Sequence, residues 1–186
     1  MKPRNSHVWD RQATDWYVEP EWCSERLFDE EEFDGAIHDP AAGMGRIVMA
    51  AHKHGYSAIG TDIHPRTRIV QKADFFKCDH DMTNTVTNPP FKLAQEFALR
   101  ALHHTRRKVA VIFPVARLNA AHWLDGSPLE RIWLLTPRPS MPPGESILNN
   151  IKPGGGKVDF CWLVFNKQKH VVRRPELRWL HREGNK

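Results

Sequence analysis

The chain has 186 residues, of which 40% are hydrophobic and 26% charged, and its formal net charge is +5. This length and composition suit one globular domain that buries a sizeable core. No apolar run reaches the length of a membrane span, and the first ten residues lack the apolar stretch of a signal peptide. We therefore expect a cytoplasmic protein with no membrane partner.

The cysteines and histidines do not form a recognisable site. Cys23, Cys78 and Cys161 are far apart and make no C-x-x-C pair, which favours a reducing compartment without a disulfide framework. The eleven histidines include His52 and His54, whose spacing of two points them in different directions on a helix. Structural or surface roles are favoured for these side chains, and we expect no metal site.

Charge is distributed unevenly along the chain. Residues 1–34 have a net charge of −6, residues 35–166 of +6, and residues 167–186 of +5. A basic body followed by a basic tail is typical of a protein with a polyanionic partner. A solvated tail with no partner is the alternative.

Strand patterns alternate with helix patterns along most of the chain. Helices are expected over residues 21–32, 45–55 and 92–105. Strands are expected over residues 36–39, 57–63, 84–87, 108–115, 129–137 and 157–165. The alternation predicts an α/β fold with a doubly wound, mainly parallel, Rossmann-like sheet of about seven strands and an antiparallel C-terminal strand.

The stretch D-P-A-A-G-M-G, Asp39 to Gly45, joins the first strand to its helix. Its glycines allow a ligand to approach the backbone, and the acidic residue suits a cationic ligand. Asp62 ends the next strand, where a carboxylate can accept from both hydroxyls of a ribose. The alternative is that Asp39 and Asp62 are loop or helix-capping residues.

The stretch T-N-P-P-F, Thr87 to Phe91, follows a short strand and precedes a helix. Two prolines fix two φ angles and remove two N–H donors, so the segment is stiff and its carbonyls are free to accept hydrogen bonds. Taken alone, it is also compatible with an ordinary loop that begins a helix.

D-P-A-A-G-M-G, G-T-D-I, A-D-F-F and N-P-P-F, in this order, resemble the motifs of class I S-adenosylmethionine-dependent methyltransferases. More narrowly, they look like those of N6-adenine DNA methyltransferases of the small phage and prophage type. The upstream D-W-Y-V-E-P resembles an additional N-terminal motif of that family, with Glu19 in place of its usual Thr. The resemblance covers residues 15–166.

The resemblance implies a catalytic domain over residues 1–166, with a cofactor-capping segment at 1–34, a loop at 137–157 and a basic tail at 167–186. The cofactor would be S-adenosyl-L-methionine. Tyr17 and Pro20 would cap its methionine end, and Asp39 would approach its amino group. The implied cofactor-binding residues are Tyr17, Pro20, Asp39, Pro40, Ala41, Gly43, Gly45, Asp62, Ile63, Asp74 and Phe75.

Within this set, Asp62 would hold the ribose, and Asp74 would accept from the adenine amine of the cofactor. Asp79 and Asp81 are competing candidates for the role of Asp74. Phe75 would stack beside the adenine, although plain core packing is the alternative for it and for its neighbour Phe76.

The implied catalytic residues are Asn88, Pro89, Pro90 and Phe91. The Asn88 side-chain oxygen and the Pro89 carbonyl would accept hydrogen bonds from the target amine, and Phe91 would stack on a base flipped out of the duplex. Methyl transfer of this kind needs no metal and no covalent enzyme intermediate.

The implied substrate is the N6 amine of adenine in DNA, in a short or relaxed sequence context, within a bacterial or phage-infected cell. An RNA base with an adenine or guanine amine is the main alternative. A protein glutamine methyltransferase and a non-catalytic nucleic-acid-binding module are further alternatives. The candidate phosphate contacts are Arg138, Lys152, Lys157, Arg173 and Arg174.

Overall fold

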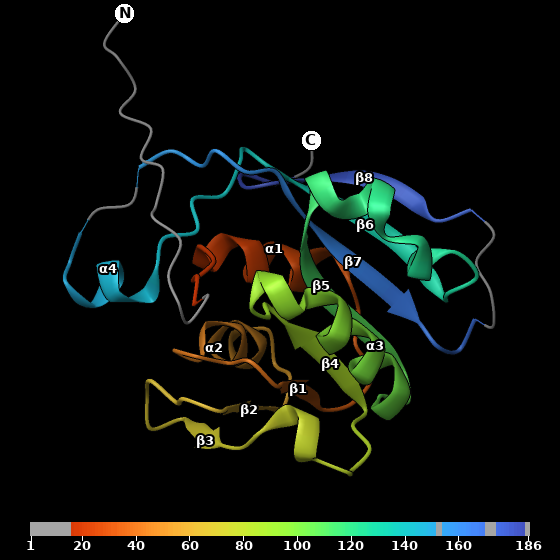
Figure 1. Ribbon diagram of the computed structural model, residues 1–186, viewed down its shortest axis with the longest axis horizontal. Helices are drawn as coiled ribbons and strands as arrows, with labels where there is room; N and C mark the ends of the chain where they lie inside the picture. The colour runs from red at the N-terminus through yellow and green to blue at the C-terminus, as the bar shows by residue number, and fades with distance from the viewer. Residues whose placement is uncertain (1–15, 152–153, 170–173, 185–186) are drawn as a thin grey trace, which may run out of the picture.

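The structure, a computed structural model, describes residues 16–151, 154–169 and 174–184. Within these ranges one eight-stranded sheet has the order β3-β2-β1-β4-β5-β7-β6-β8 (Figure 1). The strands are β1 (Ile37–Asp39), β2 (Ala58–Asp62), β3 (Val70–Lys72), β4 (Asn84–Thr87), β5 (Lys108–Pro114), β6 (Leu129–Thr136), β7 (Phe160–Asn166) and β8 (Glu176–His181). β7 runs antiparallel to both of its neighbours, and all other pairings are parallel. The expected α/β, doubly wound and mainly parallel sheet is confirmed.

Helices cover both faces of the sheet. α1 (Glu21–Glu30) and α2 (Arg46–Lys53) pack on one face and α3 (Ala94–His104) on the other (Figure 1). Successive side chains of a strand point to opposite faces, so Ile112 of β5 joins the core of α1 and α2, whereas Val111 and Phe113 join that of α3. This explains the unbroken apolar run of a central strand. No helix among the described residues is long and apolar enough to cross a membrane.

The strand order reverses between β1 and β4. β2 and β3 extend the sheet on one side of β1, and β4 and β5 extend it on the other. Ligands of open parallel sheets bind beyond the carboxyl ends of the strands at such a switch point. Asp39 ends β1 and Thr87 ends β4, and Thr87 Oγ1 donates a buried 2.8 Å hydrogen bond to Asp39 Oδ1. The two strand ends that frame the switch point are thereby held together.

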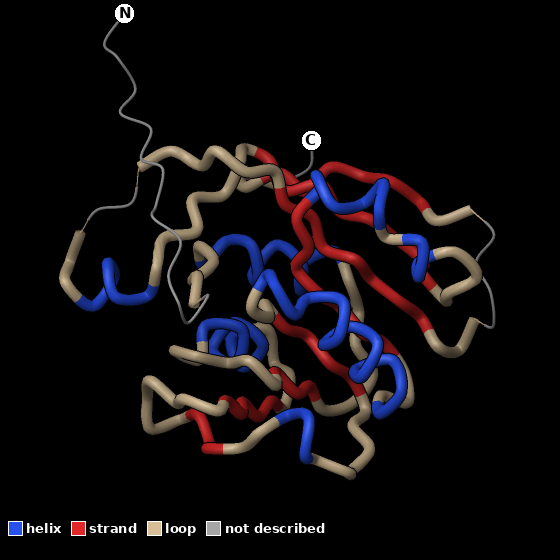
Figure 2. The backbone as a smooth tube through the Cα atoms, in the orientation of Figure 1, coloured by secondary structure: helices blue, strands red, loops and turns tan. Residues whose placement is uncertain are grey.

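Two strands and one α-helix were not expected from the sequence: β3, β8 and α4 (Gly144–Leu148). Val70 is the only buried residue of β3 and Leu180 the only buried residue of β8, so neither strand shows an alternating apolar pattern. β8 pairs with β6, and the segment expected as a basic tail therefore contains an edge strand. The expected antiparallel strand is β7, and β8 follows it. The connection between β6 and β7 is mostly loop and carries α4 to one side of the sheet (Figure 2).

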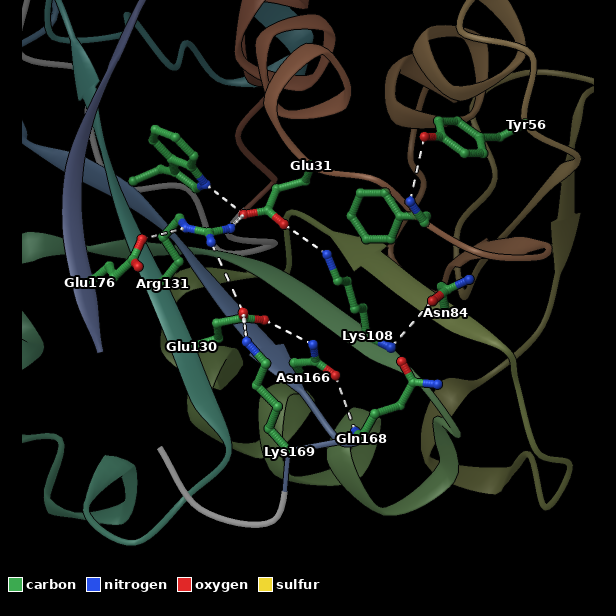
Figure 3. Close-up of polar contacts among 12 residues, drawn as sticks. Glu31, Tyr56, Asn84, Lys108, Glu130, Arg131, Asn166, Gln168, Lys169 and Glu176 are labelled. Carbon is green, nitrogen blue, oxygen red and sulfur yellow. Dashed lines mark hydrogen bonds and ion pairs between the residues drawn. The ribbon is translucent and has the colours of Figure 1, made fainter. Parts of the chain in front are cut away.

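A buried carboxylate connects the end of α1 to the amino ends of the strands. Glu31, 2% exposed, accepts hydrogen bonds of 2.9 Å from both Lys108 Nζ and Trp133 Nε1 (Figure 3). It also pairs with Arg131, which reaches Glu176 of β8 at 3.3 Å. Removing one partner of such a buried ion pair is strongly destabilising. This network belongs to the end of the sheet opposite the carboxyl edge, so we assign it a structural role.

Candidate active site

A pocket with a cavity volume of about 180 Å³ opens at the carboxyl ends of the parallel strands. Expected site residues on its wall are Tyr17, Pro40, Ala41, Gly43, Asp62, Ile63, Asp74, Phe75, Asn88 and Pro90. Expected site residues that do not line it are Pro20, Asp39, Gly45, Pro89 and Phe91. Wall residues that were not expected are Trp16, Val18, Glu19, Ala42, Met44, Arg46, His64, Arg66, Phe76, Leu93 and Phe97. No group of three or more His, Cys, Asp or Glu within the described ranges could hold a metal ion.

The two glycines of the β1–α2 loop have different roles. Gly43 has φ 47°, and a Cβ atom there would lie 3.1 Å from Trp16 Nε1, so the bare backbone keeps this part of the wall open. Gly45 has φ 81° and precedes the first residue of α2, where a Cβ atom would lie 2.7 Å from Ile69 Cδ1. Gly45 therefore serves the start of the helix and its packing, away from the pocket.

Asp39 lies behind the pocket wall and is 2% exposed. Its Oδ1 accepts hydrogen bonds from Thr87 Oγ1 at 2.8 Å and from the Ala41 N–H at 3.1 Å. Burial raises the pKa of Asp39 well above its ordinary value, and the nearby charge of Glu19 adds to the effect. These contacts shape the loop that carries Pro40 and Ala41 on the wall. Direct contact between Asp39 and a cofactor stays a prediction.

Asp62 ends β2 and lies on the pocket wall. Its Oδ2 accepts the Gly43 N–H at 2.8 Å, and its Oδ1 accepts the His64 N–H at 2.7 Å. Each carboxylate oxygen retains acceptor capacity for a further donor. The side chain is thus fixed in orientation while it can still accept from two neighbouring hydroxyls.

The turn after β3 contributes a carboxylate and two rings. Asp74 Oδ1 accepts the Phe76 N–H at 3.0 Å and begins a short 3₁₀ helix. Phe75 is 3% exposed and stacks on Phe97 with centroids 5.2 Å apart, so most of its surface belongs to the core. Phe76, 42% exposed on the pocket wall, is the more accessible ring.

The competing acidic candidates lie off the pocket wall. Asp79 lies 3.7 Å from Arg100, and Asp81 lies 3.3 Å from Arg106. Only Asp74 of these three carboxylates reaches the pocket.

Asn88 follows β4 and is 8% exposed on the pocket wall. Its Nδ2 donates to Glu19 Oε2 at 2.7 Å and to the Tyr17 carbonyl at 3.1 Å. Its Oδ1 is buried and has no hydrogen-bond partner among the described residues. Buried acceptors are seldom left unpaired, so this oxygen is a candidate to receive a donor from a ligand.

Phe91 is half-buried and packs between two other rings. It stacks on Tyr17 with centroids 5.4 Å apart, and it contacts Phe160 at 4.9 Å. Arg117 also donates a hydrogen bond to the Phe91 carbonyl. These contacts make Phe91 a support for the N-terminal segment that passes over the site.

The N-terminal segment and the β6–β7 connection meet beside the pocket. The Gly144 N–H donates to the Trp16 carbonyl at 3.1 Å, and the Val18 N–H donates to the Pro142 carbonyl at 3.0 Å. The Trp16 ring packs so closely on Gly144 that a Cβ atom there would lie 2.2 Å from it. The guanidinium carbon of Arg66 lies over the same ring, 4.2 Å from its centroid. The motif D-W-Y-V-E-P indicated that this segment matters, but not which of its side chains enter the pocket.

None of the described basic candidates lines the pocket. Arg138 pairs with Asp159 at 2.6 Å, whereas Lys157 and Arg174 are exposed. Lys152 and Arg173 lie outside the described residues. Contact of these side chains with nucleic acid stays a prediction.

Comparison with known proteins identifies the fold. Neither a family model nor a curated protein sequence matches the chain. Among solved structures, the proposed RNA methyltransferase PH1948 from Pyrococcus horikoshii is similar at a TM-score of 0.63 and 14% identity, over 90% of this chain and 95% of that chain. The M protein of the type I restriction enzyme EcoKI is similar at a TM-score of 0.63 and 13% identity, over 91% of this chain and 49% of that one.

A third similar structure, the 23S rRNA methyltransferase ErmE, has a TM-score of 0.51 and 11% identity, over 89% of this chain and 72% of that one. These proteins share an architecture with the present chain at low sequence identity. The chain therefore has the class I methyltransferase fold.

Proposed function

We propose that this protein transfers a methyl group from S-adenosylmethionine to the N6 amine of adenine in DNA. The observation that carries the proposal is the side chain of Asn88. Its buried Oδ1 has no hydrogen-bond partner within the described part of the chain, and the residue lies on the wall of the pocket at the switch point of a methyltransferase fold. A hydrogen-bond donor on the substrate would satisfy this oxygen.

The chemistry needs two acceptors and no base. The lone pair of the adenine amine is delocalised into the ring, which makes the nitrogen a poor nucleophile. Asn88 Oδ1 and the Pro89 carbonyl would each accept one N–H of the amine and so localise the lone pair on nitrogen. Pro89 is buried and Pro90 has a fixed φ, so the acceptors are held before the substrate arrives.

The pocket wall fits a cationic nucleoside cofactor. S-adenosylmethionine supplies, when bound, a methyl group activated by its sulfonium. Asp62, whose orientation is fixed by two backbone N–H groups, would accept from the ribose hydroxyls, and Asp74, which lies on the same wall, would accept from the adenine amine. Ile63, 52% exposed, and Phe76, 42% exposed, offer apolar surface to the adenine ring. The carboxylates of Asp62 and Asp74 favour the positive charge of the cofactor.

A nucleic-acid substrate is supported by the basic chain and by the unpaired acceptor for a base amine. An RNA base is the second candidate, because the proposed RNA methyltransferase and the restriction-enzyme M protein match the fold equally well. We assign phosphate contacts to Lys157 and Arg174, which are exposed, and to Lys152, Arg173 and Arg138.

Within the described ranges, the surface that we assign to reading the DNA sequence is the connection between β6 and β7. The β6–β7 connection contains the exposed Asn149 and Asn150 beside the short helix α4. An Asn can pair bidentately with adenine, and each good contact of this kind discriminates by roughly 1–3 kcal/mol. We therefore propose a short or relaxed recognition sequence.

The purified protein should be incubated with S-adenosylmethionine and, separately, duplex DNA, single-stranded DNA and RNA. Mass spectrometry of the digested product then identifies the methylated nucleoside. N6-methyldeoxyadenosine from DNA supports the proposal, and N6-methyladenosine from RNA alone would favour the second candidate. Methylated sites mapped on random DNA should share at most a very short context. A requirement for four or more defined base pairs would overturn the relaxed specificity.

A further inference from the structure

The hydrogen bonds of Asn88 determine which way its amide faces. An amide carries an oxygen acceptor at one end and an NH₂ donor at the other, and the two ends have nearly the same shape. The Nδ2 of Asn88 contacts Glu19 Oε2 at 2.7 Å and the Tyr17 carbonyl at 3.1 Å. A carboxylate and a carbonyl are acceptors, so the NH₂ end must face them. The Oδ1 end therefore faces away from these two acceptors, and among the described residues it is buried without a hydrogen-bond partner.

Glu19 is itself held firmly. It is 5% exposed, and its backbone carbonyl accepts a hydrogen bond of 2.7 Å from Arg46 of α2. The N–H of the preceding residue, Val18, donates a hydrogen bond to the Pro142 carbonyl. The following residue, Pro20, comes directly before α1. The carboxylate thus comes from a segment fixed on both sides, which is what a side chain needs in order to orient another.

We propose that Glu19 is a positioning residue for methyl transfer, which it serves by holding the Asn88 amide with Oδ1 directed at the target amine. The inference rests on the proposed function, because it assigns Oδ1 to that amine. If the Asn88 amide were rotated by half a turn, its NH₂ group would face the N–H groups of the target amine. Both groups are donors, so they would repel each other. Burial raises the pKa of Glu19 above its ordinary value, whereas its hydrogen bond from Asn88 and the charge of Arg46 favour the ionised form. In the ionised form Glu19 holds the amide more firmly than a hydroxyl would, because hydrogen bonds to a charged acceptor are roughly twice as strong as neutral ones.

Glu19 also polarises the group that it orients. Hydrogen bonds in series strengthen one another in a low-dielectric site. A carboxylate that accepts a hydrogen bond from Asn88 Nδ2 polarises the amide and increases the negative charge on Oδ1. The oxygen then accepts more strongly from the target amine, which deepens the localisation of the nitrogen lone pair.

Glu19 lines the pocket, so a direct role in cofactor binding must be distinguished from positioning. Glu19→Met keeps a similar volume and removes the acceptor. We expect kcat to fall roughly 10- to 100-fold, the loss that follows when a buried donor is left without its charged partner. The KM for nucleic acid and the dissociation constant of S-adenosylmethionine should remain close to wild type. A cofactor affinity that falls by the same factor as kcat would overturn the positioning role.

Two further variants control for charge and folding. Glu19→Gln retains a neutral acceptor for Asn88 Nδ2 and should recover part of the lost rate. Glu21→Gln removes an exposed carboxylate two residues along the chain and should behave as wild type. If Glu19→Gln were as slow as Glu19→Met, an acceptor at this position would not be what the site requires.

A double-variant comparison isolates the route of action. If Glu19 acts through Asn88, Glu19→Met should cause no further loss in the Asn88→Ala background, where residual product is counted by mass spectrometry. An equal fractional loss in both backgrounds would mean that Glu19 acts independently of Asn88.

NMR of the Asn88 side-chain amide provides a readout that does not depend on activity. The two Nδ2 protons, assigned by their disappearance in Asn88→Ala, should shift in Glu19→Met and stay near their wild-type positions in Glu21→Gln. Unchanged signals in Glu19→Met would overturn the positioning role even in an active enzyme. Absence of methyl transfer by the wild-type protein on DNA and RNA would overturn the proposed function instead, and the NMR result would still decide the contact.

Discussion

Tyr17 stacks on Phe91 with ring centroids 5.4 Å apart and an angle of 10° between the planes. The carbonyl of the same tyrosine accepts a hydrogen bond from Asn88. The stack therefore links the N-terminal segment to the N-P-P-F turn at the point where the proposed acceptor is held. Phe91 has a structural role in this arrangement in addition to any contact with a target base.

Phe91→Ala should lower both stability and activity. Loss of a half-buried ring that packs on two others should reduce the free energy of unfolding by about 1–3 kcal/mol. Chemical denaturation measures this, and Phe91→Tyr, which keeps the stack, should stay close to wild type. Phe76→Ala is a useful contrast because that ring is 42% exposed. This variant should lower the free energy of unfolding only a little, and its main effect should be weaker binding of the cofactor. An unchanged stability of Phe91→Ala would contradict the structural role.

Asp62→Ala should weaken binding of S-adenosylmethionine at least about 100-fold, because two hydroxyl contacts with a charged acceptor would be lost, each of roughly 1.5–3 kcal/mol. The fold should survive, although the Gly43 and His64 N–H groups lose their acceptor. Calorimetry measures the affinity. Asp79→Ala, which removes a side chain that is 94% exposed and off the pocket wall, is the control. Equal affinities of the two variants would remove Asp62 from the cofactor site.

The buried carboxylate of Asp39 should make stability depend on pH. Its pKa is raised in the folded protein, so the folded state binds the proton more tightly than the unfolded state. The resulting stability is fully present below the unfolded pKa of about 3.9 and is lost as the pH rises towards the folded pKa, at about 1.4 kcal/mol per pH unit. Asp39→Asn keeps an Oδ1 acceptor for Thr87 and Ala41 and cannot ionise.

Urea denaturation of both proteins between pH 4 and pH 8 tests this expectation. Other carboxylates titrate in the same range, so the relevant quantity is the difference between the two proteins. Asp39→Asn should gain stability relative to wild type as the pH rises. A difference that is constant with pH, or that changes in the opposite direction, would show that Asp39 is not a destabilising buried charge.

The sequence predicted those parts of the fold and site whose signal is local. The apolar run of β5 indicated a central strand, and D-P-A-A-G-M-G and N-P-P-F marked two loops that the structure brings to one pocket. The contact between Glu19 and Asn88 was not predictable in this way. The two residues are 69 positions apart, and only tertiary packing brings their side chains together.

Other features could not be predicted from the sequence because they depend on contacts between distant parts of the chain. β8 has a single buried residue and is stabilised as a strand by pairing with β6. Phe75 and Phe76 are identical neighbours that both contact the ring of Phe97, and only the direction of the turn decides which ring is buried and which is more exposed. The two glycines of the β1–α2 loop likewise look equivalent, yet only Gly43 reaches the pocket.

Lys157 and Arg174 should contribute to nucleic-acid affinity in a salt-dependent manner. Each phosphate contact to duplex DNA adds about 0.9 to the slope of log affinity against log salt. The double variant Lys157→Gln, Arg174→Gln should therefore show a slope smaller by about 1.8, as measured by fluorescence anisotropy. Lys53→Gln, which removes an exposed cation on α2, is the control. Deleting the tail would be less informative, because Leu180 is fully buried in β8 and its loss would disturb the fold.

The central claim is that Asn88 Oδ1 accepts from the target amine, and Asn88→Ala tests it most directly. Methyl incorporation into DNA and S-adenosylmethionine affinity should be measured on the same preparation, with Asn119→Ala as a control that removes an exposed Asn away from the pocket. We expect transfer to fall by at least about 100-fold, as for loss of a preorganised catalytic contact. Cofactor affinity should be nearly unchanged. Near-normal turnover of Asn88→Ala would contradict the account.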